Sequence, residues 1–139
     1  MRNVDLSDVD NADLHRDLEI LVATEPEDLA GILAHIAEVD ARRLYLSAGF
    51  PSMLAYCVVR LNLSAPVAMR RIRASEVARQ FPRMFEGVAR GRLGLGAIML
   101  LAPYLTEENA EGLIEGAEAM PKFDLEQFLF YLLGSPDSA

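Results

Sequence analysis

The sequence predicts an all-α fold, a single compact multi-helix domain of about seven to eight helices. Apolar residues recur at helical spacing along nearly the whole chain. No segment shows the strict alternation, rich in Val, Ile and Thr, that is typical of strands. A chain of 139 residues suits one domain, which removes roughly two thirds of its unfolded surface from water. We place this domain at residues 1–133 and expect residues 134–139 to form a flexible tail.

The first two helices are predicted from apolar stripes and one capping pattern. Val9 to Ala23 carries leucines at helical spacing. Thr24 and Glu27 match a capping box, in which the hydroxyl accepts an amide hydrogen bond and the glutamate reaches back. We therefore expect the second helix to begin at Thr24 and to continue to about Leu46, where a Gly-Phe-Pro sequence follows.

The next two helices form a central pair. Ser52 is a candidate cap for a helix from Met53 to Leu61, and Ser64 for a longer helix that runs to about Phe81. Pro82 disfavours helical geometry in the residue before it. The two helices are therefore predicted to be joined by a very short turn.

The remaining helices are separated by glycines and opened by polar residues. Two short helices are predicted at about 83–90 and 95–102. Residues 106–109 place acidic side chains at the start of a seventh helix, beside the positive end of its dipole. Asp124 with Gln127 is the predicted cap of an eighth.

The charge of the chain is segregated along the sequence. The formal net charge is −9 over residues 1–41, +8 over 42–92 and −7 over 93–139, and it totals −8. Of the 13 basic residues, Lys122 alone is a lysine. Such segregation indicates either that the basic block pairs with the acidic ends, or that it binds an anionic partner. The sequence leaves both interpretations open.

The anionic-partner interpretation rests on the central pair, whose spacing is that of a helix-turn-helix with Ala68 and Ile72 directed inward. The second helix would then present Ala65, Pro66, Met69, Arg70 and Arg73 toward a groove. An Ala-Pro-Met surface is poorly suited to reading bases, so phosphate contact with little base specificity is the expectation. The candidate DNA contacts are Arg70, Arg71, Arg73, Arg79 and Arg83, aided by Arg42, Arg43, Arg60, Arg90 and Arg92.

The spacing of the arginines limits this interpretation. Arg70, Arg71 and Arg73 cannot all point the same way on a helix, so at most two of them face any one groove. The alternative is that the arginines pair with Glu76, Glu86 and the carboxylates of the first and seventh helices, or bind an acidic protein surface. In that case the chain is a protein-interaction or assembly domain.

The last predicted helix is apolar on all sides, over residues 128–133. Such a helix must be covered by its own domain or by another chain. We favour a homodimer through this end, with Phe128, Phe130, Tyr131 and Leu132 at the interface. Burial in the core of the monomer is the alternative.

No motif for catalysis or for a cofactor is found, and we expect neither an enzyme nor a cofactor. Cys57 is predicted to be a small buried hydrophobic residue. His15 is expected at the surface and His35 partly buried, with no metal role for either. A row of glutamates is interpreted as a solvated helix face: Glu107, Glu108, Glu111, Glu115 and Glu118.

Cellular location is predicted from three features. The first residues lack the apolar run of a secretory signal, and the single cysteine cannot form an intramolecular disulfide. The longest apolar stretch, residues 95–104, is far shorter than a membrane span. We therefore expect a cytoplasmic protein without a membrane segment.

One resemblance supports the helix-turn-helix interpretation. The string AGFPSMLAYCVVRLNLSAPVAMRRIRASEVARQFP, followed by LLAPYLTEEN, resembles the helical domain that precedes HNH nuclease domains in myxobacterial-type proteins. The similarity covers about residues 38–133. The chain has only His15 and His35, so the resemblance implies a stand-alone accessory domain for DNA association or assembly, without the nuclease centre.

Overall fold

The computed structural model describes residues 5–120 and 122–133, and over these residues the all-α prediction is confirmed. Nine α-helices and a short 3₁₀ helix, η1, follow one another in the described part, without a strand. They are α1 (Asn11–Thr24), α2 (Leu29–Ala41), α3 (Leu44–Ser47), α4 (Met53–Val59), α5 (Ala65–Gln80), α6 (Arg83–Ala89), α7 (Leu95–Leu101), η1 (Ala102–Tyr104), α8 (Ala110–Glu118) and α9 (Lys122–Leu133). The tail predicted at 134–139 lies outside the described residues.

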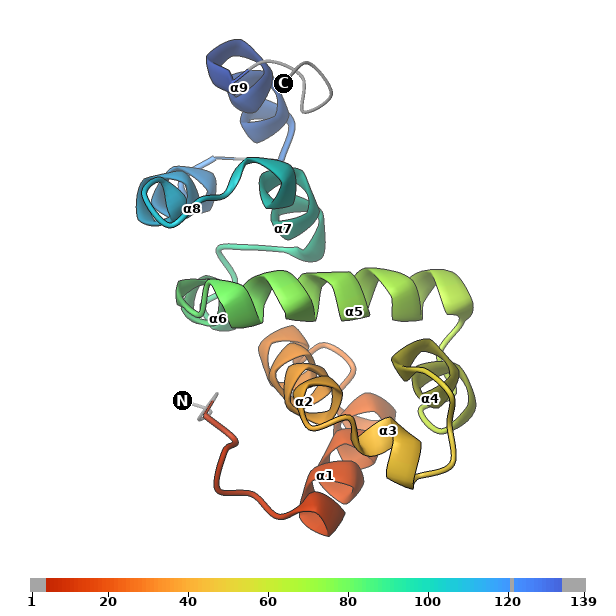
Figure 1. Cartoon of the computed structure of the whole chain (residues 1–139). Coiled ribbons are helices and arrows are strands. Elements are labelled where there is room, and N and C mark those ends of the chain that lie inside the picture. Colours follow the sequence, from red (N-terminus) through yellow and green to blue (C-terminus); the bar gives the residue numbers. More distant parts are fainter. Residues whose placement is uncertain (1–4, 121, 134–139) are drawn as a thin grey trace.

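The longest helix, α5, crosses the middle of the molecule (Figure 1). Helices α1 to α4 lie on one side of it, and α7, α8 and α9 lie on the other, with α6 near its C-terminal end. On its two sides α5 packs against α2 and α4, which precede it, and against α7, which follows it. The core is therefore divided between two layers that share α5.

Small side chains allow α5 to be covered on both flanks. Ala68, Ala74, Ser75 and Ala78 are fully buried, and the Ser75 hydroxyl donates to the carbonyl of Ile72 within the same helix. Short side chains permit neighbouring helices to approach closely. The exposed residues of α5 are 65, 66, 69, 70, 73, 76, 79 and 80.

Two capping predictions are confirmed. The Ser52 hydroxyl accepts from the amide of Ala55 at 3.1 Å, and the Ser64 hydroxyl accepts from the amide of Val67 at 3.4 Å. The predicted start of the seventh helix at residues 106–109 is too early: α8 begins at Ala110, after a turn in which the side chains of Thr106 and Asn109 accept from each other's amides. Each cap satisfies backbone donors that the first turn leaves unpaired, and it fixes where the helix begins.

The predicted capping box at Thr24 is wrong. Thr24 is the last residue of α1, and its hydroxyl donates to the carbonyl of Ile20, one turn earlier. The N-cap of α2 is Asp28, whose carboxylate accepts from the amide of Gly31 at 3.1 Å. A threonine hydroxyl can donate to the carbonyl one turn earlier or accept from an amide that follows it. Thr24 does the former.

The predicted continuation of the second helix to Leu46 is also wrong. Helix α2 ends at Ala41, and the four-residue α3 follows at Leu44–Ser47. Arg43 lies between them with a φ of 55°, in the left-handed region that interrupts an α-helix. The chain therefore changes direction two residues after Ala41.

The last helix begins earlier than predicted, at Lys122, so Asp124 lies in its first turn instead of capping it. Negative charge in that turn still interacts favourably with the helix dipole. Among the helices of the described residues, none combines the length and the apolar character required to cross a lipid bilayer.

Candidate nucleic-acid interface

Helices α4 and α5 form the predicted helix-turn-helix-like pair. Helix α4 ends at Val59, two residues before the predicted end, and five residues lead to α5. Asn62 turns the chain with a φ of 57°, and the amide of Leu63 donates to the carbonyl of Cys57 at 3.2 Å. The turn is therefore bonded back to α4.

The predicted facing of α5 is confirmed at its N-terminal half. Ala68 is fully buried and Ile72 is half-buried, whereas the five residues predicted to face a groove are all exposed. These are Ala65, Pro66, Met69, Arg70 and Arg73. Met69, Arg70 and Arg73 therefore lie together on one exposed strip of α5, which carries one apolar side chain and two charged ones.

Arg70 and Arg73 are the least neutralised arginines on this strip. No described residue forms an ion pair with Arg70. Arg73 has one, with Glu76 one turn later, at 3.7 Å and with both side chains more than half exposed. Exposed pairs of this kind contribute little, because water and salt screen them. Both guanidinium groups can therefore meet an external anion.

Arg71 belongs to a different face, as the spacing predicted. It is half-buried, and its Nε is buried without a hydrogen-bond acceptor among the described residues. Its charge lies near enough to Cys57 of α4 to oppose the rise that burial causes in the pKa of that thiol. The Arg71 side chain therefore lies against α4.

Arg79 and Arg83 are paired with carboxylates of other helices. Arg79 Nη1 lies 3.3 Å from Glu38 Oε1 and 3.5 Å from the carbonyl of Ala37. Arg83 donates to Glu118, whose side chain is only 7% exposed, and this hydrogen bond raises the pKa of Arg83. A phosphate would have to displace these carboxylates before either arginine could bind it.

Most of the remaining basic block is paired too. Arg42 and Arg90 form ion pairs at 2.8 Å with Glu38 and Glu86, and Arg60 donates to Glu19 while lying over the ring of Tyr56. Burial opposes ionisation of Glu38, but the hydrogen bonds from Arg42 and Arg79 outweigh it and lower the pKa of Glu38. Many arginines of the central basic block therefore pair with carboxylates of the acidic segments, on α1, α2 and α8.

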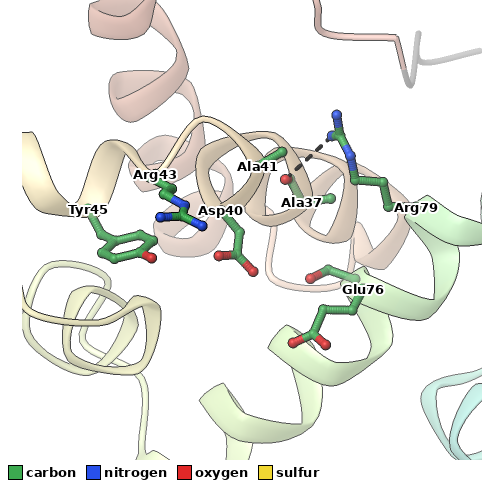
Figure 2. A pocket seen from close by; sticks show the side chains of 8 residues that line it. Ala37, Asp40, Ala41, Arg43, Tyr45, Glu76 and Arg79 are labelled. Carbon is green, nitrogen blue, oxygen red and sulfur yellow. Dashed lines mark hydrogen bonds between the residues drawn. The ribbon is translucent and has the colours of Figure 1, made fainter.

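A hollow of about 360 Å³ between α2 and α5 mixes both signs of charge. Figure 2 shows the carboxylates of Asp40 and Glu76 extending into it from the two helices, with Arg43 beside Asp40. Arg79 points away from this space, toward the carbonyl of Ala37. Burial raises the pKa of Asp40, which Arg43 and Arg79 partly offset. An anion entering here would meet two carboxylates.

The histidines and the cysteine have structural surroundings. His15 is half-buried and its Nδ1 lies 2.8 Å from the Tyr56 hydroxyl, so the predicted surface position is wrong in part. His35 is buried, more than predicted, with its Nδ1 2.7 Å from the carbonyl of Gly31. Cys57 is fully buried, as predicted, and burial raises its pKa to about 12. Over residues 5–120 and 122–133, no cluster of three or more His, Cys, Asp or Glu is placed to hold a metal.

Helix α9 is covered by its own domain on one side only. Leu125 and Leu129 are buried, whereas Phe128, Phe130 and Tyr131 are 37%, 67% and 89% exposed. The side chain of Leu132, the fourth predicted interface residue, lies outside the described residues. The helix therefore has a buried leucine edge and an exposed aromatic one, and the homodimer stays a prediction.

Two residues have structural roles that the sequence analysis did not predict. Glu118 was grouped with four solvated glutamates, and no local signal distinguishes it from Glu115. Arg42 holds the N-terminal segment by donating to the carbonyls of Leu6 and Val9 at 2.8 and 2.7 Å. Its pairing with Glu38 does have a readable signal, the four-residue spacing of opposite charges on a helix.

Comparison of the chain with known protein families, with curated proteins and with solved structures finds no match. The resemblance to the HNH-associated helical domain therefore stays a prediction.

Proposed function

We propose that this chain is a non-catalytic, DNA-associated helical module that contacts phosphates through the exposed N-terminal half of α5. The observation that carries the proposal is the contrast within the arginine block. Arg79 and Arg83 are bound to carboxylates, whereas Arg70 and Arg73 project from the second helix of a helix-turn-helix-like pair without a strong partner. Phosphate oxygens are ligands that guanidinium groups bind well.

The proposed contact is small and carries little base specificity. Besides the two arginines the exposed strip offers Met69, and Ala65 and Pro66 lie at its beginning. None of these three side chains donates or accepts a hydrogen bond at a base edge. The net charge of −8 adds long-range repulsion, so binding is weak and is favoured by low salt.

The number of phosphates contacted gives a quantitative test. Each neutralised phosphate contributes about −0.9 to the slope of log affinity against log salt concentration. Contact by Arg70 and Arg73 alone predicts a slope of about −2, whereas all five arginines predicted from the sequence would give about −4.5. Fluorescence anisotropy of a labelled mixed-sequence duplex, titrated between about 50 and about 200 mM salt, measures this slope.

The matched variants are Arg70→Ala/Arg73→Ala and Arg90→Ala/Arg92→Ala. Both remove two positive charges from exposed arginines, but the second pair lies outside α5. We expect the first variant to lose binding at the lower salt and the second to retain most of it. Equal losses of affinity in the two variants would show that binding depends on the overall charge of the chain and not on α5. No binding of the wild-type chain at about 50 mM salt would refute the proposal.

A second candidate function, protein interaction, is favoured by the aromatic edge of α9. Phe130 and Tyr131 expose most of their surface, and aromatic side chains are enriched in the cores of protein interfaces. In this case the exposed arginines bind an acidic protein surface, and α9 docks a partner, including a second copy. Light scattering that finds only monomer at tens of micromolar protein would remove the homodimer.

A further inference from the structure

Two surfaces at opposite ends of α5 carry opposite charges, and both face solvent. The first, which we call the basic edge, consists of Met69, Arg70 and Arg73. The second, which we call the acidic groove, has a floor of Phe81, Pro82, Ala110 and Ile114 and a rim of Glu107 and Glu111. Neither surface is neutralised by a strong ion pair within the described part of the chain.

The basic edge combines one exposed apolar side chain with two cations. Met69 is 59% exposed, which is unusual for a side chain of this size and character. Arg70 follows it directly, and Arg73 lies one turn further along the same strip. Methionine is flexible and fits irregular apolar hollows, and both Met and Arg are enriched at protein interfaces. This composition is typical of a contact surface.

The acidic groove is a hollow of about 360 Å³ where the end of α5 meets α8. Ala110 and Ile114 are buried in its floor, and Glu107 and Glu111 are exposed at its rim. Arg83 also lines the hollow, but its guanidinium is bonded to Glu118, and Glu111 acts on its pKa only to a smaller extent. Because Arg83 is paired with Glu118, the exposed Glu107 and Glu111 leave the rim of the groove with a negative charge.

The two surfaces cannot meet within one chain. Met69 and Gln80, which lines the groove, are eleven residues apart on one straight helix, or about 16 Å. In two copies, however, the surfaces are complementary in charge and character: an exposed apolar side chain beside two cations, and an apolar hollow beside two carboxylates.

We propose that the chain associates with itself head to tail, with the basic edge of one copy seated in the acidic groove of the next. Met69 fills the hollow, and Arg70 and Arg73 pair with Glu107 and Glu111 of the second copy. The contact is heterologous, so every copy keeps one free surface of each kind. Association therefore continues beyond two copies unless a ring closes.

The test uses two alanine variants of the full chain, Arg70→Ala/Arg73→Ala and Glu107→Ala/Glu111→Ala. Sedimentation velocity of the wild type at about 50 mM salt is expected to show species larger than a dimer, which dissociate as salt is raised. Each variant alone is expected to have a dissociation constant at least roughly tenfold weaker. An equimolar mixture of the two variants restores one intact contact and is expected to give a one-to-one heterodimer and nothing larger.

Several outcomes would overturn the proposal: a monomeric wild type at low salt, association unaffected by either variant, or a mixture that stays monomeric. Association lost in Phe130→Ser/Tyr131→Ser but kept in both alanine variants would assign the contact to α9 instead. The test also separates this proposal from DNA binding, because Glu107→Ala/Glu111→Ala removes self-association and leaves the DNA-contacting face of α5 unchanged.

Discussion

Arg42 Nε lies 2.8 Å from Glu38 Oε2, one turn earlier on α2. The ion pair orients the guanidinium, whose two terminal nitrogens then donate to the backbone carbonyls of Leu6, Ser7 and Val9 and to the side chain of Asn11. One side chain thus attaches the segment before α1 to the end of α2. The planar fork of arginine supplies several donors in a fixed geometry, which lysine does not.

The first prediction is that Arg42→Ala lowers the free energy of unfolding by about 3 kcal/mol, because it removes charged donors from several partly buried carbonyls. Arg42→Lys should recover only a small part of this loss. Arg43→Ala is the matched control, since the exposed Arg43 forms no ion pair or hydrogen bond with its side chain in the described part and acts on Asp40 only at longer range; it should change stability by less than about 0.5 kcal/mol. Urea denaturation measures all three, and equal values for Arg42→Ala and Arg43→Ala would contradict the prediction.

The second prediction concerns the ion pair of Arg83 and Glu118. Glu118→Gln should cost about 2 kcal/mol of stability, because the buried carboxylate accepts a charged hydrogen bond that an amide replaces poorly. Glu115→Gln, on the exposed side of the same helix, should stay within about 0.5 kcal/mol of the wild type. Thermal and urea denaturation provide the comparison. A cost for Glu115→Gln as large as that for Glu118→Gln would show that burial is not the cause.

The third prediction concerns pH. Burial, with a smaller contribution from Arg60 and opposed by Glu19, lowers the pKa of His15 below its usual 6.5. The unfolded chain then binds a proton more readily than the folded one, so stability is complete above pH 6.5 and falls as pH decreases through that value. His15→Asn keeps an acceptor for Tyr56 and cannot titrate. Denaturation between about pH 7.5 and 5.5 should show a smaller decrease for the variant, and parallel curves would refute the assignment.

The fourth prediction concerns Cys57. Because burial raises its pKa to about 12, the thiol is protonated at neutral pH and shielded from reagents. Labelling of the native protein with a disulfide reagent at about pH 8 should be slower than in denaturant by a factor on the order of 10³ or more. Fast stoichiometric labelling of the folded protein would contradict both the burial and the pKa of this thiol.

Local patterns predicted the fold well because they depend on neighbouring residues. Ser52 and Ser64 were identified as caps from the sequence alone, since a cap needs only its own hydroxyl and an amide three residues later. The break at Arg43 has no such signal, because a left-handed conformation is usually marked by glycine or asparagine. The error at Thr24 arose because one hydroxyl has two local uses.

For the candidate site, the sequence predicted which residues share a face of one helix, but not which residues of different helices form ion pairs. Helical spacing correctly separated exposed Arg70 and Arg73 from half-buried Arg71. It could not show that Arg79 reaches Glu38, 41 residues away in the sequence, or that Arg83 reaches Glu118. Such pairs depend on how α5 and α6 lie against α2 and α8, which no window of neighbouring residues contains.

The position of α5 between two layers has a consequence for how the domain unfolds. Its buried small residues contact helices that precede it and a helix that follows it, so removing either layer uncovers the same helix. Neither layer has a complete core without α5, and neither can therefore open far while the other stays intact. We expect one cooperative transition in which tyrosine fluorescence, to which all four tyrosines contribute, and overall helicity change together.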